Sequence, residues 1–390
     1  MMAARVLVLA IIAATPAWAQ EHQHTTAAAP WQWSIDANVF AGYNYQRRKF
    51  TDFDEVESQN WLMTQLSRTF GSASTLELNG MFSFEAFTLR DIGSPQVFQT
   101  GETFEAAPLI DYQHPHDLVM NAGAVYRHRV GKVDVGIAAY AVGPAPIGPP
   151  VFMHRESAAE NPQSPLSHHY LDSMHVTPGV VSISLGRNGF SIEAGAFHGR
   201  EPDENRLDLD TAALDSFGAR LSWADGPWQV QVSGADLKTP ERTSPYDARR
   251  LTASAAYFKG DEQRAFAWTV AFGQNREFFG NLEAYLVEVS RRAGKNALYG
   301  RAESVSKDLL DAGFHPIGVG HSHRQSRVAA LTLGYVRDVA IRSFGAFGVG
   351  GDITAYGVPA NLEESYGSPL SFHLFLRYRG HAGARPSHRH

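Results

Sequence analysis

Apolar and polar side chains alternate along most of this chain, in runs that are long for a β-strand. The apolar face of residues 33–45 consists of Trp33, Ile35, Ala37, Val39, Ala41, Tyr43 and Tyr45. The opposite face consists of Ser34, Asp36, Asn38, Gly42 and Asn44. A run of about twelve residues exceeds the usual strand of about five or six and matches a tilted strand that crosses a bilayer. The pattern therefore predicts membrane-spanning β-strands.

The alternation returns about sixteen times, and an even number of strands closes an antiparallel barrel with both termini on one side. The candidate strands begin near residues 33, 60, 73, 117, 132, 173, 189, 212, 227, 250, 263, 281, 296, 325, 342 and 370. Short connections are expected at residues 131–132, 187–189, 225–226, 259–262, 292–295 and 337–341. Long ones are expected at residues 47–59, 91–116, 142–172, 201–211, 239–248, 308–324 and 358–368.

Short periplasmic turns and long extracellular loops are the arrangement of bacterial outer-membrane proteins. The predicted fold class is therefore all-β, a single transmembrane antiparallel β-barrel of about 16 strands. A soluble β-sandwich or propeller is the alternative, because its strands alternate in the same way. Strand length, the unequal connections and aromatic strand ends favour the barrel. These strand ends are Trp33, Tyr43, Tyr45, Tyr126, Trp223, Trp228 and Tyr257.

The first residues have the pattern of a secretory signal peptide. Arg5 precedes an apolar run at residues 6–14, and Ala17 and Ala19 form an A-x-A cleavage site. We therefore expect a signal peptide at residues 1–19, a flexible periplasmic lead at 20–32, the barrel at 33–379 and a tail at 380–390. The expected partners are the lipids and the assembly machinery of a Gram-negative outer membrane.

Composition removes several classes of function. The chain has no cysteine, which excludes disulfides, zinc thiolate sites and cysteine nucleophiles. The formal net charge is −6, which argues against a nucleic-acid partner. After the signal peptide no apolar run reaches the 18 or more residues of a transmembrane helix.

Charged residues of both signs occur on the polar parity of the strands, where they are expected to line the lumen. On a lipid-facing site each would cost about 2–4 kcal/mol at mid-depth. The expected lumen-lining residues are Asp36, Glu77, Glu85, Arg127, Arg129, Glu193, Arg220, Arg301, Glu303 and Arg377, with Arg379 following. Two interpretations remain open, a narrow polar pore and a filled lumen whose charges neutralise one another.

Two histidine-rich segments lie in the predicted second and third long loops. Residues 111–117 read D-Y-Q-H-P-H-D and residues 164–175 read S-P-L-S-H-H-Y-L-D-S-M-H. Ser164 as N-cap and Pro165 in the first turn predict about two turns of helix. Such a helix would place His168, Asp172 and His175 on one face. Adjacent hairpins would bring both segments to the rim of the barrel.

Imidazoles and carboxylates together suit a divalent transition metal such as zinc, copper, nickel or non-haem iron. The candidate ligands are His114, His116, Asp117, His154, His168, His169, Asp172 and His175. His175 also shares the parity of lipid-facing residues in the strand that follows. A further cluster, F-H-P-I-G-V-G-H-S-H, occupies residues 314–323. The alternative is that these histidines only bind backbone groups and stabilise the loops.

A lipid-modifying hydrolase is a further alternative. Ser167 beside His168, or Ser322 between His321 and His323, could supply a nucleophile and a base. Neither pair lies in a recognisable motif, and the chain has no phosphate-binding glycine loop and no H-E-x-x-H. The sequence therefore favours a protein that is not an enzyme.

The two histidine segments resemble signatures, Q-H-P-H-D and S-H-H-x-x-D-S-x-H, of a group of uncharacterised bacterial outer-membrane β-barrel proteins. The resemblance is strong over residues 100–200 and extends to the remaining wall by pattern. It implies an outer-membrane location and a single site built from both segments. Such proteins are sometimes associated with heavy-metal handling, and the group supplies no catalytic residues. The favoured function is selective passage or binding of a small solute, with a divalent transition metal as the leading candidate.

Overall fold

The computed structural model describes residues 30–210, 213–278, 280–307, 309 and 325–384. The expected signal peptide and the histidine cluster at residues 314–323 lie outside these residues. The first half of the wall contains β1 (Gln32–Arg48), β2 (Thr51–Glu57), β3 (Asn60–Phe70), β4 (Ser74–Phe82), β7 (Val119–Val130), β8 (Val133–Gly143), β9 (Thr177–Arg187) and β10 (Phe190–Phe197). The second half contains β11 (Ser216–Asp225), β12 (Trp228–Leu237), β13 (Ala248–Gly260), β14 (Arg264–Glu277), β15 (Gly280–Ala293), β16 (Asn296–Lys307), β17 (Ser326–Arg342), β18 (Gly345–Gly357) and β19 (Leu370–Gly383).

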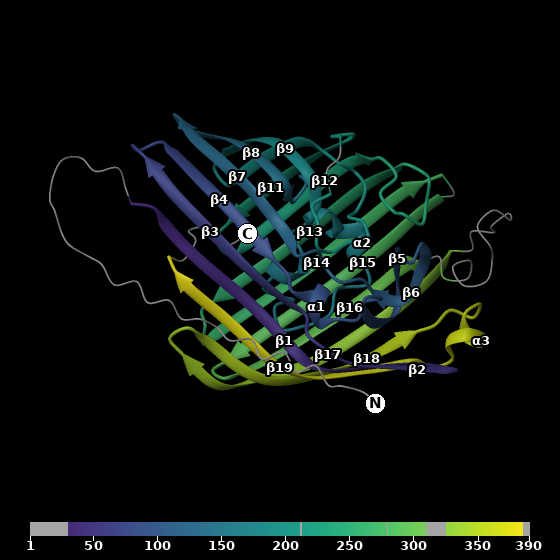
Figure 1. Ribbon diagram of the computed structural model, residues 1–390. Helices are drawn as coiled ribbons and strands as arrows, with labels where there is room; N and C mark the ends of the chain where they lie inside the picture. Colours follow the sequence, from purple (N-terminus) through teal and green to yellow (C-terminus); the bar gives the residue numbers. More distant parts are fainter. Residues whose placement is uncertain (1–29, 211–212, 279, 308, 310–324, 385–390) are drawn as a thin grey trace.

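These strands form a closed antiparallel barrel of 16 strands, as the sequence predicted (Figure 1). Strand β1 closes it by pairing with β19 along most of its length, from Ser34↔Gly383 to Arg47↔Leu370. On its other side β1 pairs first with β3 and then with β2, so β2 and β3 together form one interrupted wall strand. Alternate connections are tight turns, such as the one in which Asn188 and Gly189 have φ angles of 54° and 81°.

Three predicted boundaries are wrong. Residues 47–59 are mostly strand, because β1 continues to Arg48 and β2 pairs back along it. Residues 337–341 are not a turn, because β17 passes through them with a bulge between Asp338 and Ala340. The first four residues of the predicted tail extend β19 to Gly383. In each case backbone pairing with a neighbouring strand overrides the local turn composition.

The outer face of the wall is a belt of exposed apolar side chains. Ile183, Phe217, Leu298 and Leu376 are each more than 60% exposed, although they lie within regular strands. Aromatic side chains pack together near the tight turns, where Trp228 contacts the rings of Tyr257 and Trp268. An apolar band bordered by aromatic residues is the surface that a barrel presents to lipid. None of the helices in the described residues is long and apolar enough to cross a bilayer.

We expect Leu376→Arg to lower the free energy of unfolding by about 2–4 kcal/mol, since it would place a guanidinium in hydrocarbon. Leu376 is 62% exposed and lies between Ala41 and Val349 on the neighbouring strands. Urea unfolding of the barrel in lipid vesicles measures the change. Leu376→Phe keeps an apolar side chain and is the matched control. Equal stability of the two variants would mean that this face does not contact lipid.

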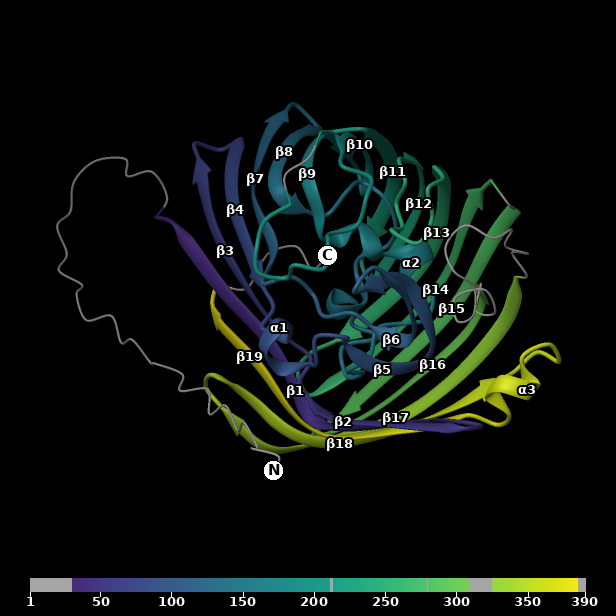
Figure 2. The same cartoon turned by 45° about the vertical axis from the view of Figure 1, so that its right-hand side comes forward.

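The long connections on one side fold into the barrel instead of extending from it (Figure 2). They carry α1 (Glu85–Thr88), the hairpin of β5 (Ser94–Phe104) and β6 (Ala107–Gln113), η1 (Phe152–His154), α2 (His168–Leu171) and η2 (Ser173–His175), while α3 (Glu363–Tyr366) lies between β18 and β19. Phe98 of β5 and Leu166 join an apolar core with Val305 and Val328 of the wall. We call this inner layer, residues 83–118 and 144–176, the plug.

Buried ion pairs fasten the plug to the wall. Arg155 donates to Glu288 on β15 at 2.8 and 3.0 Å, and Arg301 donates to the same carboxylate at 3.0 Å. Glu160 accepts from Arg292 and Arg377. Because most plug residues are buried, the structure favours the filled lumen over an open polar pore at this level of the barrel.

The predicted lumen-lining residues fall into several environments. Glu77 and Arg127 pair at 2.7 Å across the wall, and Glu193 and Arg220 pair at 2.8 Å. The other inward-facing predictions have the following partners: Asp36 binds His381, Arg301 binds Glu288, Glu303 binds Ser167, Arg377 binds Glu160 and Asp338, and Arg379 binds Glu160.

Two of these predictions are wrong. Glu85 is not on the wall, because β4 ends at Phe82 and Glu85 is the first residue of α1. The side chain of Arg129 is 62% exposed and binds Asp134 beside a tight turn, because β7 has passed beyond the interior at this point.

Candidate metal centre

Three histidines from two distant segments of the plug converge inside the barrel. His116, His168 and His175 each offer a ring nitrogen, and these atoms all lie within 4.8 Å of one another. The ring centroids of His116 and His175 are 5.4 Å apart, and those of His168 and His175 are 5.3 Å apart. A tetrahedral zinc ion bound at about 2.0–2.1 Å sets its ligand nitrogens about 3.4 Å apart. Small side-chain movements would therefore let all three bind one ion.

His116 is positioned by the segment after β6 and by α1. Pro115 keeps the backbone of His114 extended, so the chain runs straight from the hairpin into the interior. Glu85 in α1 then accepts hydrogen bonds from both the backbone N–H and the Nδ1 of His116, at 3.0 and 2.8 Å. The carboxylate thereby fixes the ring.

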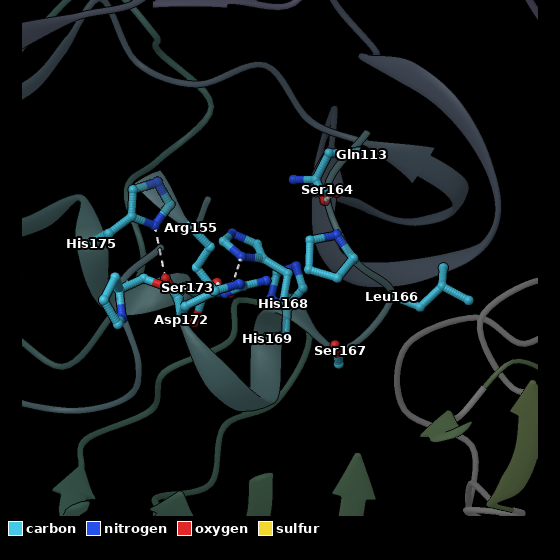
Figure 3. Close-up of polar contacts among 12 residues, drawn as sticks. Gln113, Arg155, Ser164, Leu166, Ser167, His168, His169, Asp172, Ser173 and His175 are labelled. Atoms are coloured by element: carbon cyan, nitrogen blue, oxygen red, sulfur yellow. Dashed lines mark hydrogen bonds and ion pairs between the residues drawn. The ribbon is translucent and has the colours of Figure 1, made fainter. Parts of the chain in front are cut away.

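His168 and His175 are positioned around Asp172. The predicted two-turn helix is wrong: α2 ends at Leu171, Asp172 has φ −140°, and η2 follows after this kink. Nor is Ser164 a helix cap, because its hydroxyl binds Gln96 and Gln113. Even so, the kink lets Asp172 bind His168 Nδ1 at 2.7 Å through its side chain and His175 Nδ1 at 2.9 Å through its carbonyl (Figure 3).

Each of the three imidazoles therefore has its Nδ1 against an oxygen that can only accept. This fixes Nδ1 as the protonated nitrogen and leaves Nε2 with a free lone pair. The Nε2 atoms of His116 and His175 are buried and have no hydrogen-bond partner. Histidines that bind metals characteristically donate the other ring N–H to a carboxylate or a carbonyl. The arrangement is thus that of three oriented metal ligands.

Asp172 is itself held in place by a buried guanidinium. Arg155 lies against its carboxylate and also pairs with Glu288. Burial acts to raise the pKa of Asp172, but the charge of Arg155 and the hydrogen bond to His168 together hold that pKa below its ordinary value. Asp172 therefore stays ionised and continues to orient His168.

Burial also favours the neutral form of the His168 and His175 imidazoles. It lowers the pKa of His175 well below its ordinary value. Burial also lowers the pKa of His168 below its ordinary value, although Asp172 acts to raise it. Neutral imidazole is the form that binds a metal ion.

The structure divides the single site predicted from the sequence. His114 lies 2.6 Å from Glu102, and His169 lies 3.3 Å from Glu201, so neither belongs to the three-histidine cluster. The reason is geometric, because neighbouring residues such as His168 and His169 point in different directions. Asp172 lies on the Nδ1 side of His168 and His175, orients both rings and faces Arg155.

Two further candidates lie outside the cluster. Asp117 pairs with Arg206 at 3.2 Å, and burial raises its pKa to about 6. His154 packs against Trp61, with its Nε2 3.4 Å from the sulfur of Met81. Both contacts involve long-range partners that the sequence spacing does not reveal.

The hydrolase alternative at Ser167 is not supported by its contacts. The Ser167 hydroxyl is buried and donates to Glu303 at 2.7 Å, while His168 is turned toward Asp172. Ser322 lies outside the described residues.

Sequence reasoning missed the residues that hold the site together. Glu85 was assigned to the wall, and Arg155, Glu160 and Glu288 had no assigned role. Glu102 and Glu201 were missed as well. No local signal identifies them, because each is a single charged residue whose partner is distant in the chain.

Solved barrels show the same architecture. Pseudomonas putida OprB, in a structure at high pH, aligns with a TM-score of 0.54 and 9% identity, over 90% of this chain and 94% of that one. The anion-selective porin of Comamonas acidovorans aligns with a TM-score of 0.51 and 12% identity, over 90% and 100%. Salmonella typhi OmpF, in complex with daunomycin, aligns with a TM-score of 0.53 and 9% identity, over 88% and 97%.

The chain has the fold of an outer-membrane porin. With its lipid-facing belt, this closed barrel is located in the bacterial outer membrane. No family model and no curated protein matches the sequence. At these identities the likeness shows the fold alone. Evidence on function comes from the side chains inside the barrel.

Proposed function

We propose that this barrel binds a divalent transition-metal ion at His116, His168 and His175, on the route by which small solutes pass through the outer membrane. The observation that carries the proposal is the convergence of three imidazoles, each with Nδ1 held by an oxygen acceptor. Such a set satisfies both the ligand requirement and the orienting contacts of a metal centre.

The ligand set indicates which ions fit. Three neutral imidazoles without a thiolate favour Zn²⁺ or Cu²⁺ over hard ions such as Mg²⁺ or Ca²⁺. Three protein ligands leave a coordination position for water or an incoming anion. An ion held in this way can exchange, which suits a binding station on a transport route better than a closed structural site.

The plug determines how passage would occur. Because the loops that carry the three histidines fill the interior, an ion that crosses the barrel has to meet them or displace them. We therefore propose slow, selective passage or capture, with the histidines as the selective element.

We expect His116→Ala and His175→Ala each to weaken Zn²⁺ binding by at least about 100-fold, since loss of orienting partners alone costs 10- to 100-fold. Calorimetry on the chelator-treated barrel in detergent measures Zn²⁺ affinity, and the visible spectrum of bound Co²⁺ reports nitrogen coordination. His128→Ala is the matched control, because His128 binds Ser74 at the exposed end of a wall strand.

Two outcomes would contradict the proposal. Unchanged Zn²⁺ affinity in both folded histidine variants would mean that the imidazoles only stabilise the loops. Equal Zn²⁺ flux into vesicles containing wild type or His175→Ala, followed with an enclosed zinc dye, would remove the histidines from the route of passage.

A further inference from the structure

A second group of buried ligand atoms lies beside the three histidines. Glu102 of β5, His169 of α2 and Glu201 of the connection between β10 and β11 offer ligand atoms within 4.8 Å of one another. Glu241, from the connection between β12 and β13, approaches the same imidazole. None of the three ligands belongs to the metal centre described above.

The polar atoms of this group lack ordinary partners. His169 is 4% exposed, and neither of its ring nitrogens makes a hydrogen bond. Its Nδ1 lies 3.3 Å from Glu201 Oε1 and 3.4 Å from Glu241 Oε1, contacts that do not reach hydrogen-bond geometry. Leaving a buried polar atom unpaired costs about 1–3 kcal/mol. A cation between His169 and the carboxylates would satisfy these atoms together.

The neighbouring carboxylates of this group also favour a bound cation. Glu102 and Glu201 offer carboxylate oxygens within 4.8 Å of each other, close enough to repel when both are ionised. The nearest guanidinium, Arg206, is 3.6 Å from Glu102 and is shared with Asp117. The charge of Arg250 also acts on Glu201 and Glu241, and a cation bound between Glu102 and Glu201 would relieve the mutual repulsion of these two carboxylates.

The two histidine segments connect this group to the first centre. His114 and His116 flank Pro115, and their ring centroids are 6.2 Å apart. His168 and His169 are adjacent, and their centroids are 5.5 Å apart. The first segment thus places His116 in the metal centre and His114 beside Glu102, while the second supplies His168 and His175 to the metal centre and His169 to the second group.

Close packing against His169 supports a defined position for its ring. Gly101 has φ +130°, and a Cβ at this position would lie 2.9 Å from the imidazole. Only glycine allows the β5 backbone to approach the ring so closely in this conformation.

We propose that Glu102, His169 and Glu201 bind a second divalent cation, so that the plug holds two neighbouring ions in sites of different chemistry. Two carboxylates and one imidazole favour a harder ion such as Mn²⁺ or Fe²⁺, whereas three imidazoles favour Zn²⁺ or Cu²⁺. The inference goes beyond the proposed function and does not depend on it, because the two sites share no ligand.

The test measures Mn²⁺ binding to the chelator-treated full-length barrel, from the loss of the free-ion electron paramagnetic resonance signal. We expect one bound Mn²⁺ in wild type and at least a 100-fold weaker affinity in Glu102→Gln and Glu201→Gln, which keep side-chain shape. His169→Gln is a further test variant, which removes the imidazole and leaves both carboxylates in place. Asp236→Asn removes an exposed carboxylate and is the matched control.

Measurement of Zn²⁺ on the same proteins separates the two sites. If both exist, Glu201→Gln keeps the histidine-dependent Zn²⁺ and loses Mn²⁺, and His175→Ala does the reverse. Wild-type Mn²⁺ affinity in folded Glu201→Gln and His169→Gln would overturn the second site and leave the first intact. If the barrel bound Mn²⁺ but its Zn²⁺ affinity did not depend on the three histidines, the proposed function would be overturned and the second site would remain.

Discussion

Glu160→Gln is expected to open the interior of the barrel to small anions. Glu160 is a buried plug residue, and its carboxylate pairs with Arg292, Arg377 and Arg379 of the wall. After the change Arg292 and Arg377 still pair with Asp338, but all three guanidinium groups lose the charge of Glu160. Removing one partner of a buried ion-pair network costs about 3–5 kcal/mol, because the opposite charges remain without compensation. The plug should therefore detach locally and expose a positively charged stretch of wall.

Single-channel recording in a salt gradient measures this effect. We expect higher conductance in Glu160→Gln than in wild type, with a reversal potential that indicates anion preference. Glu156→Gln alters an exposed carboxylate of the same loop and is the matched control. Wild-type conductance and selectivity in Glu160→Gln would show that the other plug contacts are sufficient to hold the loop.

Arg155→Ala is expected to damage both the plug and the metal centre. The guanidinium joins Glu288 of the wall to Asp172, and both carboxylates are almost completely buried. Without it Asp172 loses its guanidinium partner and Glu288 keeps only Arg301, which should lower the free energy of unfolding by about 3–5 kcal/mol. Because Asp172 orients His168 and His175, we also expect Zn²⁺ affinity to fall about 10- to 100-fold.

Urea unfolding and Zn²⁺ calorimetry on the same preparation measure the two effects. Arg129→Ala removes an exposed guanidinium that pairs with Asp134 and should change neither quantity by much, since exposed pairs contribute about 0–1 kcal/mol. If a folded Arg155→Ala variant bound Zn²⁺ as tightly as wild type, the position of the imidazoles would not depend on Asp172.

The barrel itself could be predicted because its pattern is local. A strand such as β1 alternates between lipid and interior at every residue, so Trp33 and Ser34 reveal their faces without knowledge of any partner. Strand ends were less accurate, since β17 and β19 continue through turn-forming residues where a neighbouring strand supplies hydrogen bonds.

The site was only partly predictable for the opposite reason. The sequence indicated that the histidines near residues 114 and 168 belong together. It also placed His175 among the candidate ligands, although the parity of the following strand pointed to a lipid-facing position. In the structure His175 precedes β9 and lies in η2.

The sequence by itself determined a membrane-spanning antiparallel barrel and two histidine segments on neighbouring long loops, because alternation and residue type are properties of short stretches. Only the tertiary structure decided that these loops turn inward, that Asp172 and Glu85 orient the rings, and that the histidines separate into two groups. Those outcomes depend on buried charges such as Glu288 and Glu201, which are far away along the chain. The closure of the barrel determines which of these residues pair, and a short sequence pattern does not reveal those pairs.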